Sequence, residues 1–277
     1  MSSRLCQKPS VAAIGPPTSA DRFRLTLPGW TDILESDFLS NVEPAWRAGR
    51  LALRDPVSLC PEAVEWDRHW QQLDRSLQGQ AFSLYRRQIR SRCVARTLSR
   101  FLPESGIFAE CGCGSGETSS RIPMCPGQTF LAVDFAWHPL CQALHQPCFA
   151  GGIQADIRRL PFRNNSLDGL WNLGVLEHFE PHEQLLILQE FHRVLKPGAS
   201  IILWWPPRHA LDRMLLSPFG WPFPNEPGRA DRITARELLR SAGFDHVTAR
   251  YAGGDCLTEM ILTGTRGTRS VESEGAH

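Results

Sequence analysis

The segment FAECGCGSGETSS, residues 108–120, carries glycine at every second position shortly after a glutamate, Glu110. The three glycines are Gly112, Gly114 and Gly116. Glycine adopts the left-handed backbone conformations of sharp turns, and without a Cβ it lets a ligand approach the main chain closely. The N-terminus of a following helix would offer further unpaired N–H donors. The spacing G-x-G-x-G differs from the G-x-G-x-x-G of nicotinamide-dinucleotide sites, so the segment predicts a ligand-binding loop of another kind.

An aspartate ends each of the next two apolar runs, Asp134 in FLAVDFA and Asp156 in GGIQADI. In α/β proteins a carboxylate at the end of the second strand accepts hydrogen bonds from ribose hydroxyls. Charge-assisted bonds of this kind contribute about 1.5–3 kcal/mol. Alone, either aspartate could be an ordinary solvated side chain. The glycine loop and Asp134 together indicate an adenosine-containing ligand.

Two cysteines, Cys111 and Cys113, alternate with the loop glycines, and Cys125 lies further along the chain. Structural zinc sites usually draw their ligands in pairs two to four residues apart, with a second pair further on. No such second pair is evident in the sequence. The pattern favours small side chains that fill the loop, and we expect no metal.

The candidate for acid–base catalysis is His178, in LEHFEPH. A neutral histidine near pH 7 can take a proton from a hydroxyl group. A capping or packing role is the alternative, and the sequence leaves both open. His182 and His192 are expected to be surface or helix-packing residues.

Between positions 75 and 100 the chain contains seven arginines and no acidic residue. They are Arg75, Arg86, Arg87, Arg90, Arg92, Arg96 and Arg100. Such a row could follow a nucleic-acid backbone, hold a substrate carboxylate or phosphate, or be a solvated helix face. The formal net charge of +1 gives no support to a nucleic-acid partner.

After Pro103, short apolar runs alternate with helical segments, which is typical of a parallel sheet with crossover helices. We expect strands near residues 107–111, 129–134, 152–155, 169–173, 201–205, 246–251 and 258–265, with helices between them. The clearest helices are predicted over 181–195, where Leu185, Leu188, His192 and Leu195 share a face, and over 234–242, before Gly243. The predicted fold class is α/β: a doubly wound, Rossmann-like sheet of seven mostly parallel strands with helices on both faces.

The sequence also predicts how the chain is divided. Residues 1–20 are expected to form a disordered arm, and residues 21–104 a helical extension rich in tryptophan and arginine. In that extension, Trp66, Trp70, Leu73 and Leu77 are expected to share a buried face. Residues 105–265 form the ligand-binding domain, followed by a polar tail, 266–277.

A long connection, residues 204–231, interrupts the predicted domain. Connections of this length are usually functional or disordered, and its large aromatic residues favour an apolar lid. The residues expected to line a substrate pocket there are Trp204, Trp205, Phe219, Trp221 and Phe223.

Composition supports a globular protein of a reducing compartment. Hydrophobic residues make up 42% and charged residues 21% of 277 residues, which is ordinary for soluble proteins. The nine cysteines are scattered and odd in number, which favours free thiols. Because no stretch reads as a secretory signal or a membrane span, we expect a cytoplasmic protein; its oligomeric state stays open.

Residues 107–265 resemble, in order, the class I S-adenosylmethionine-dependent methyltransferases. The segments that carry the resemblance are AECGCGSG, VDFA, ADIRRLPFRNNSLDGLWNLGVLEHF and EFHRVLKPGASIIL. The resemblance implies S-adenosylmethionine as cofactor and an in-line transfer of its methyl group.

By this resemblance, Glu110 positions the loop near the methionine amino group, and the three glycines pass beneath the methionine part. Asp134 would hold the ribose, and Phe135 beside it is also expected to contact the cofactor. Asp156 would receive the adenine amino group, with the backbone around Ile157 beside the ring. The backbone of Asn172 and Leu173 would contact the methionine amine. Trp204 and Trp205 would leave the sheet towards the substrate side.

The residues just beyond the fourth strand bear on the acceptor. Asn172 continues as Leu173-Gly174-Val175, without the Asn/Asp-Pro-Pro-aromatic sequence of enzymes that methylate exocyclic base nitrogens. The Pro-Cys nucleophile of RNA cytosine enzymes is also absent there. The stretch from LPF to LKPG most resembles the branch that acts on small, lipophilic molecules, which implies a small, apolar or aromatic acceptor. Methylation of RNA or protein, and a catalytically silent cofactor-binding partner protein, are the alternatives.

Overall fold

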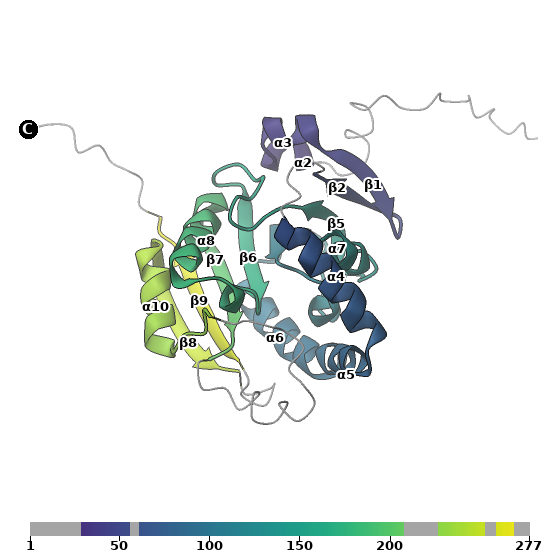
Figure 1. Cartoon of the computed structure of the whole chain (residues 1–277). Coiled ribbons are helices and arrows are strands. Elements are labelled where there is room, and N and C mark those ends of the chain that lie inside the picture. The colour runs from purple at the N-terminus through teal and green to yellow at the C-terminus, as the bar shows by residue number, and fades with distance from the viewer. Residues whose placement is uncertain (1–28, 56–60, 208–226, 253–258, 269–277) are drawn as a thin grey trace, which may run out of the picture.

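The structure is a computed structural model that describes residues 29–55, 61–207, 227–252 and 259–268. Within these residues nine strands form one sheet (Figure 1), in the order β1-β2-β5-β4-β3-β6-β7-β9-β8. Their bounds are β1 (Glu43–Arg47), β2 (Arg50–Arg54), β3 (Gly106–Cys111), β4 (Gln128–Asp134), β5 (Phe149–Gln154), β6 (Leu167–Leu173), β7 (Leu195–Trp205), β8 (Phe244–Tyr251) and β9 (Met260–Arg266). The strands from β2 to β7 in this order are parallel, and antiparallel strands complete both edges. The prediction of a mostly parallel α/β sheet is confirmed.

The predicted count of seven strands is too low. The seven expected strands are β3 to β9, and the other two form a hairpin, β1–β2, inside the segment predicted as helical. Its turn, Ala48-Gly49, has φ of 49° and 74°, the geometry of a two-residue hairpin, and β2 adds to the sheet beside β5. The helical prediction is therefore wrong for residues 43–54, because neither strand alternates buried and exposed residues, and short runs without alternation do not distinguish a strand from a helix.

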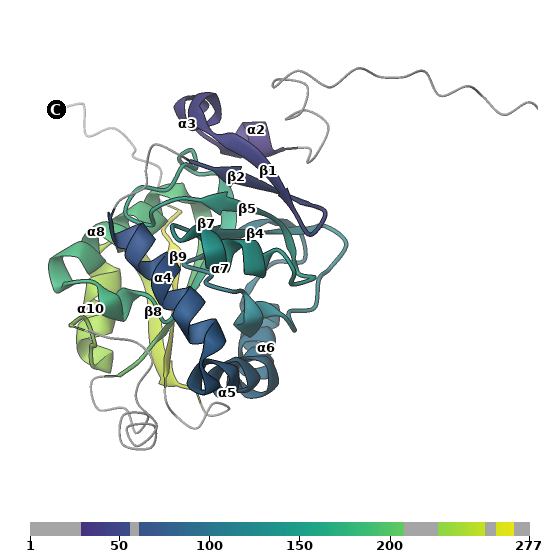
Figure 2. The same cartoon turned by 45° about the vertical axis from the view of Figure 1, so that its right-hand side comes forward.

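Helices cover both faces of the sheet (Figures 1 and 2), with α8 and α10 on one face and α6 and α7 on the other. Their bounds are α4 (Pro61–Arg75), α5 (Leu77–Tyr85), α6 (Ser91–Phe101), α7 (Trp137–Ala143), α8 (Pro181–Val194) and α10 (Arg232–Ser241); the short α2 (Trp30–Ile33) and α3 (Ser36–Asn41) precede the hairpin. A π-helical turn, Arg86–Arg90, joins α5 to α6.

The central strands are buried on both faces, and alternate residues build two apolar clusters. Phe108 and Phe130 face α6 and α7, where Trp171 packs edge-on against Phe130 with 5.3 Å between ring centroids. Their neighbours Ala109 and Leu131 belong to the cluster shared with α8 and α10. Burial on both sides is what a parallel sheet with crossover helices requires.

Two of the expected crossover helices do not form. In the connection from β3 to β4, the described structure contains only a 3-10 helix, Glu117–Ser119. Pro123 and Pro126 follow it, and proline removes a backbone donor and disrupts a helix interior. The expectation that a helix N-terminus follows the glycine loop is therefore wrong. The described segment 155–166, between β5 and β6, likewise holds no helix.

The helices expected over 181–195 and 234–242 are α8 and α10. Gly243, with φ of 97°, follows the end of α10 as predicted for a helix stop. Among the described helices, none combines the length and the apolar composition needed to span a bilayer.

One residue of the expected buried face of α4 is misplaced. Trp70 and Leu73 are buried, but Leu77 is 84% exposed. The reason is local: the Oγ of Ser76 accepts the N–H of Gly79 at 2.9 Å and caps a new helix. Leu77 therefore begins α5 instead of continuing the face of α4.

Candidate functional site

Four polar side chains gather at the carboxyl edge of the sheet. Glu110 lies near the end of β3 and Asp134 ends β4. Asp156 follows β5, and Asn172 lies near the end of β6. The order β5-β4-β3-β6 makes these strands neighbours, and the strand order reverses between β3 and β6. Ligands of doubly wound sheets bind at such a switch point, so the predicted binding residues share the edge where a ligand is expected.

The glycine loop needs glycine for two reasons. Gly112, Gly114 and Gly116 have φ of 73°, 50° and 66°. A residue with a side chain would be strained at these values. A Cβ on Gly114 would also lie 2.6 Å from the ring of Trp70, and one on Gly116 would lie 2.7 Å from Phe149. The loop is thus fixed by its own dihedrals and by close packing around it.

Asp134 holds the glycine loop from the neighbouring strand. Its Oδ2 accepts the N–H of Gly114 at 2.8 Å, and its Oδ1 accepts the N–H of Ala136 at 2.9 Å. Burial raises the pKa of Asp134 to about 6, although both hydrogen bonds favour the ionised form. A carboxylate offers about four acceptor positions, so the side chain keeps capacity for the hydroxyl groups of a ligand.

Glu110 lies deeper in the sheet and is 1% exposed. Burial raises the pKa of its carboxyl to about 8, although hydrogen bonds from Ser119 and Trp171 and the nearby charge of Arg90 favour ionisation. At neutral pH this carboxyl is therefore largely protonated. A cation placed beside it would reverse that balance.

Buried polar atoms without partners also lie at this edge. Among the described residues, four buried atoms there have no hydrogen-bond partner: Glu110 Oε2, Ser115 Oγ, Gln154 Oε1 and Asn172 Oδ1. Buried polar groups are nearly always paired, and an unpaired one costs about 1–3 kcal/mol. A ligand with several N–H and O–H groups would supply the missing donors.

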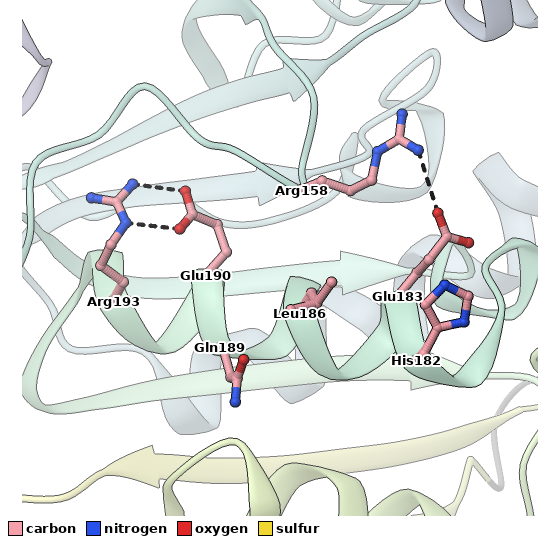
Figure 3. Close-up of a pocket in the computed structure, with 7 residues that line it drawn as sticks. All are labelled: Arg158, His182, Glu183, Leu186, Gln189, Glu190 and Arg193. Atoms are coloured by element: carbon pink, nitrogen blue, oxygen red, sulfur yellow. Dashed lines mark hydrogen bonds and ion pairs between the residues drawn. The ribbon is translucent and has the colours of Figure 1, made fainter.

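Arg158 holds Asp156, two residues before it. Its Nε and Nη2 donate to Asp156 Oδ2 at 2.9 and 2.7 Å, and its main-chain N–H donates to Oδ1 at 2.8 Å. Nη2 also donates to Glu62 on α4 at 2.7 Å. Nη1 lies 3.4 Å from Glu183 on α8, and Figure 3 shows these two side chains facing each other. We call Arg158, Asp156, Glu62 and Glu183 the Arg158 network.

Helix α4 covers this edge of the sheet (Figure 2) and is attached to it by polar and aromatic contacts. Trp70 packs against the glycine loop. The carboxylate of Asp67 accepts the N–H of His138 at 2.8 Å, at the start of α7. Trp66 packs edge-on against His178 with 5.0 Å between ring centroids. The extension before residue 105 therefore contributes directly to the candidate site.

The predicted catalytic residue, His178, ends a 3-10 helix, Leu176–His178, just beyond β6. Its ring is partly buried against Trp66. This position lies at the same edge as the carboxylates, and the contact also gives the ring a packing role. A catalytic role for His178 stays a prediction.

The arginine row does not form a single face. Arg86 and Arg90 are buried: Nη2 of Arg86 lies 2.7 Å from Glu117, and Nε of Arg90 donates to Glu259 at 3.0 Å. Arg87 also donates to Glu117, at 2.8 Å. The other exposed members are Arg75, Arg92, Arg96 and Arg100. The row thus separates into ion pairs beside the glycine loop and a set of exposed cations spaced four residues apart on α6.

The remaining predicted cofactor contacts lie next to these groups. The carbonyl of Phe135 accepts a hydrogen bond from Gln154 at 2.9 Å. Ile157 and Leu173 are buried, 5% and 8% exposed. Their contacts with a cofactor stay predictions.

Two residues predicted to leave the sheet remain inside it. Trp204 and Trp205 belong to β7 and pair with Ile261 and Met260 of β9. They are 1% and 0% exposed, and the indole N–H of Trp205 donates to the carbonyl of Gly228 at 3.0 Å. The expectation is wrong because β7 continues to residue 205 and the apolar rings are buried on its two faces. A role in lining the acceptor pocket stays a prediction.

Several predictions fall outside the described residues. They are the arm 1–20, residues 208–226 of the lid with Phe219, Trp221 and Phe223, and the tail beyond residue 268.

Sequence reasoning missed three kinds of residue at this edge. Arg158 had a local signal, because a long side chain two residues after Asp156 can fold back onto it. Glu117 also had one, since it directly follows the glycine loop. Glu62 and Trp66 had none, because only the path of α4 brings them to the site.

Comparisons with known proteins agree with this geometry. Residues 109–203 match a family model described as a methyltransferase domain. Over 114 residues, 39% of the chain, the sequence is 31% identical to the biotin biosynthesis bifunctional protein BioHC of Saccharophagus degradans. That match spans 20% of the relative, about a fifth of its length.

Solved structures show the same fold. One is a methyltransferase of Thermotoga maritima described as a possible histamine N-methyltransferase: identity is 16%, the match covers 72% of this chain and 99% of that chain, and the TM-score is 0.55. Another is human N-acetylserotonin methyltransferase in complex with S-adenosylmethionine: identity is 20%, coverage is 72% and 56%, and the TM-score is 0.53. Residues 109–203 thus match a methyltransferase domain, and the chain shares the fold of these solved methyltransferases.

Proposed function

We propose that this protein transfers a methyl group from S-adenosylmethionine to a small, apolar or aromatic acceptor. The observation that carries the proposal is the set of buried, unpartnered atoms of Glu110, Ser115, Gln154 and Asn172 beside the glycine loop. S-adenosylmethionine has an ammonium group, two ribose hydroxyls and an adenine amino group. These are the donors that such atoms lack, so the residues present fit this cofactor.

Each end of the cofactor has a chemical counterpart along the edge. The glycine loop would pass beneath the methionine part, with Glu110 and the end of β6 facing its ammonium group. Asp134 would accept the ribose hydroxyls with the acceptor positions that the loop leaves open. Asp156 would accept the adenine amino group.

The sulfonium of bound S-adenosylmethionine activates the methyl group for in-line attack by a nucleophile. The chain therefore has to supply orientation and a dry site. Positioning alone can lower a barrier by about 7–11 kcal/mol in well-oriented reactions. Trp66 and Trp70 on α4 shield the edge from water, and His178 could take a proton from an acceptor hydroxyl.

The names of the structural neighbours support a small acceptor. One is a methyltransferase of N-acetylserotonin and another a possible methyltransferase of histamine. Both names refer to small molecules with an aromatic ring, and this agrees with the resemblance of the segment from LPF to LKPG.

Calorimetric titration with S-adenosylmethionine tests the cofactor part of the proposal. Asp134→Asn keeps the shape of the side chain but removes its charge, and we expect cofactor affinity to fall by about 2 kcal/mol, roughly thirtyfold. His178→Ala is the matched control: it should leave affinity unchanged and, if His178 is the base, lower turnover about 10²-fold or more. Thermal unfolding of each variant checks that the loop is intact. Absence of heat with the folded wild-type protein would overturn the proposal.

A second candidate function is methylation of RNA or an acidic protein. The observation in its favour is the exposed arginine set on α6, Arg92, Arg96 and Arg100. A polyanion held there should be released steeply by salt. Elution from heparin that does not change between Arg92→Ser/Arg96→Ser and the wild type would exclude that role. Tight cofactor binding without turnover on any acceptor would instead favour a catalytically silent partner protein.

A further inference from the structure

Arg158 contacts both carboxylate oxygens of Asp156, through its side chain and its main chain. Nε lies 3.1 Å from Oδ1 and 2.9 Å from Oδ2, Nη2 lies 2.7 Å from Oδ2, and the main-chain N–H of residue 158 lies 2.8 Å from Oδ1. A planar guanidinium that contacts both oxygens fixes the plane of a carboxylate as well as its position. The Asp156 side chain is 25% exposed, so without the guanidinium its carboxylate could rotate toward solvent.

Arg158 is itself fixed from two other elements. Nη2 donates to Glu62 in the first turn of α4, and Nη1 lies near Glu183 in the first turn of α8. Its guanidinium also lies over the ring of Phe179, 5.8 Å from the centroid. Three segments that are far apart in the sequence therefore hold one guanidinium in place.

Arg158 and Glu183 line one end of a pocket beside α8 that also contains a second arginine, Arg193. Figure 3 shows Arg193 at the opposite end of the hollow beside α8, where its guanidinium pairs with Glu190. The donors of Arg158 are also largely used. Of its five N–H groups, three point at Asp156 and Glu62 and one at Glu183.

Arg158 could influence a bound base in two ways, by a direct hydrogen bond or through Asp156, and the occupied donors distinguish between them. With most donors occupied, Arg158 is poorly placed to hydrogen-bond a base directly. It can act through Asp156, whose carboxylate only accepts hydrogen bonds. A purine with a 6-amino group offers a donor to that carboxylate, whereas a purine with a 6-oxo group offers another acceptor.

Resting on the proposed function, we propose that Arg158 is a positioning residue that orients Asp156 toward the 6-amino group, so that the site selects adenosine over inosine cofactors. The arginine stabilises one orientation of the carboxylate before the ligand arrives. Selectivity then depends on the contact between Arg158 and Asp156, and not on any single one of the contacts that Arg158 makes with Glu62 and Glu183.

The test measures the Kd of S-adenosylhomocysteine and of S-inosylhomocysteine by calorimetry on the full chain. The two compounds differ in the 6-substituent, amino or oxo, and in the proton that the 6-oxo base carries on N1. We expect the wild type to prefer the adenosine compound about tenfold or more, since the 6-oxo group would place an acceptor against a carboxylate that only accepts hydrogen bonds. Arg158→Met should reduce this preference to about threefold or less. Arg158→Lys keeps the charge but cannot contact both oxygens, so it should also lose most of the preference.

The matched control is Glu62→Gln, which alters a different partner of the same guanidinium. It should leave the preference within about twofold of the wild-type value. If Arg158→Met fails to fold, Arg158→Lys decides the question. A wild-type preference retained by the folded arginine variants would overturn the role of Arg158 and leave the proposed function standing. Failure of the wild type to bind either compound would overturn both.

Discussion

The charged groups at the two ends of the carboxyl edge are buried to different extents. Near Gly174, just beyond β6, Arg90 and Glu259 form a pair whose side chains are 9% and 8% exposed. At the other end, Arg158 is 31% exposed and its partner Glu62 is 57% exposed. The first pair is shielded from water, and the second remains within reach of solvent and salt.

Because of this difference, we expect the buried pair to contribute to the stability of the fold and the exposed network to orient a ligand group. Burial lowers the pKa of Arg86 to about 10 even though Glu117 lies beside it, and burial raises the pKa of Glu110 to about 8. Charges in such surroundings cannot lose a partner cheaply. The Arg158 network is screened, so its contribution to stability is small, and it can orient a ligand group without determining whether the chain folds.

The same substitution at both ends should show the largest contrast. Arg90→Met leaves Glu259 buried without this partner, and we expect the free energy of unfolding to fall by about 3–5 kcal/mol. Arg158→Met should cost about 1 kcal/mol or less, and its cost should shrink further in 1 M salt. Urea denaturation at low and high salt measures both. Equal costs for the two variants would remove the distinction between the ends.

Two glycines with positive φ, Gly116 in the glycine loop and Gly49 in the β1–β2 turn, allow the same comparison for the backbone. Gly116→Ala places a Cβ 2.7 Å from the ring of Phe149 and 3.2 Å from the Cα of Ala143, at a φ of 66°. We expect a loss of about 2–4 kcal/mol, from backbone strain and overpacking together.

Gly49→Ala in the β1–β2 turn is its control, because φ there is 74° and nothing lies within 4 Å of the added Cβ. Its loss should be about 1 kcal/mol, the strain alone. Thermal unfolding of the two variants isolates the packing part. Similar losses for both would show that the glycine loop is not tightly enclosed.

A further difference between the buried groups concerns pH. Glu110 has a raised pKa of about 8, against an ordinary value of 4.5, so between these values the native state binds the extra proton. The contribution of Glu110 to the free energy of unfolding is therefore fully present below about pH 4.5 and declines as pH rises toward about 8. The slope of this decline is at most about 1.4 kcal/mol per pH unit. Glu110→Gln should flatten this decline in denaturation measured across the range.

Glu117 provides a control of opposite sign. Burial alone would raise its pKa, but Arg86, Ser83 and Arg87 outweigh burial and lower it. Its contribution is therefore present at neutral pH and is lost as pH falls, so Glu117→Gln should remove stability at neutral pH and not under acidic conditions. A decline toward pH 8 that persists in Glu110→Gln would contradict the assignment of that decline to Glu110.

How much of the site could be predicted depended on the distance between interacting residues in the chain. Gly112, Gly114 and Gly116 could be predicted because a sharp turn with positive φ favours glycine at its own positions. The strands β3 to β9 could be predicted because each contains a short apolar run, a pattern that lies within the strand itself. Asp134 could be placed as well, since it ends such a run. In these cases the constraint lies within a few residues.

Other features depend on contacts between distant segments. Arg86 and Arg92 look alike in the sequence, yet one is buried with Glu117 and the other is exposed. No local pattern pairs Arg158 with Glu62, which are 96 positions apart.

By itself, the sequence determined the conformation of the glycine loop, the β3–β9 strands and the edge where a ligand is expected, because backbone dihedrals and apolar patterning act locally. The tertiary structure alone decided that β1 and β2 extend the sheet, that α4 lies over the carboxyl edge, and which charges are buried. The physical reason is that burial and ion pairing depend on which surfaces meet in space. Those surfaces come from segments that are far apart in the chain, and the local sequence of neither segment indicates the contact.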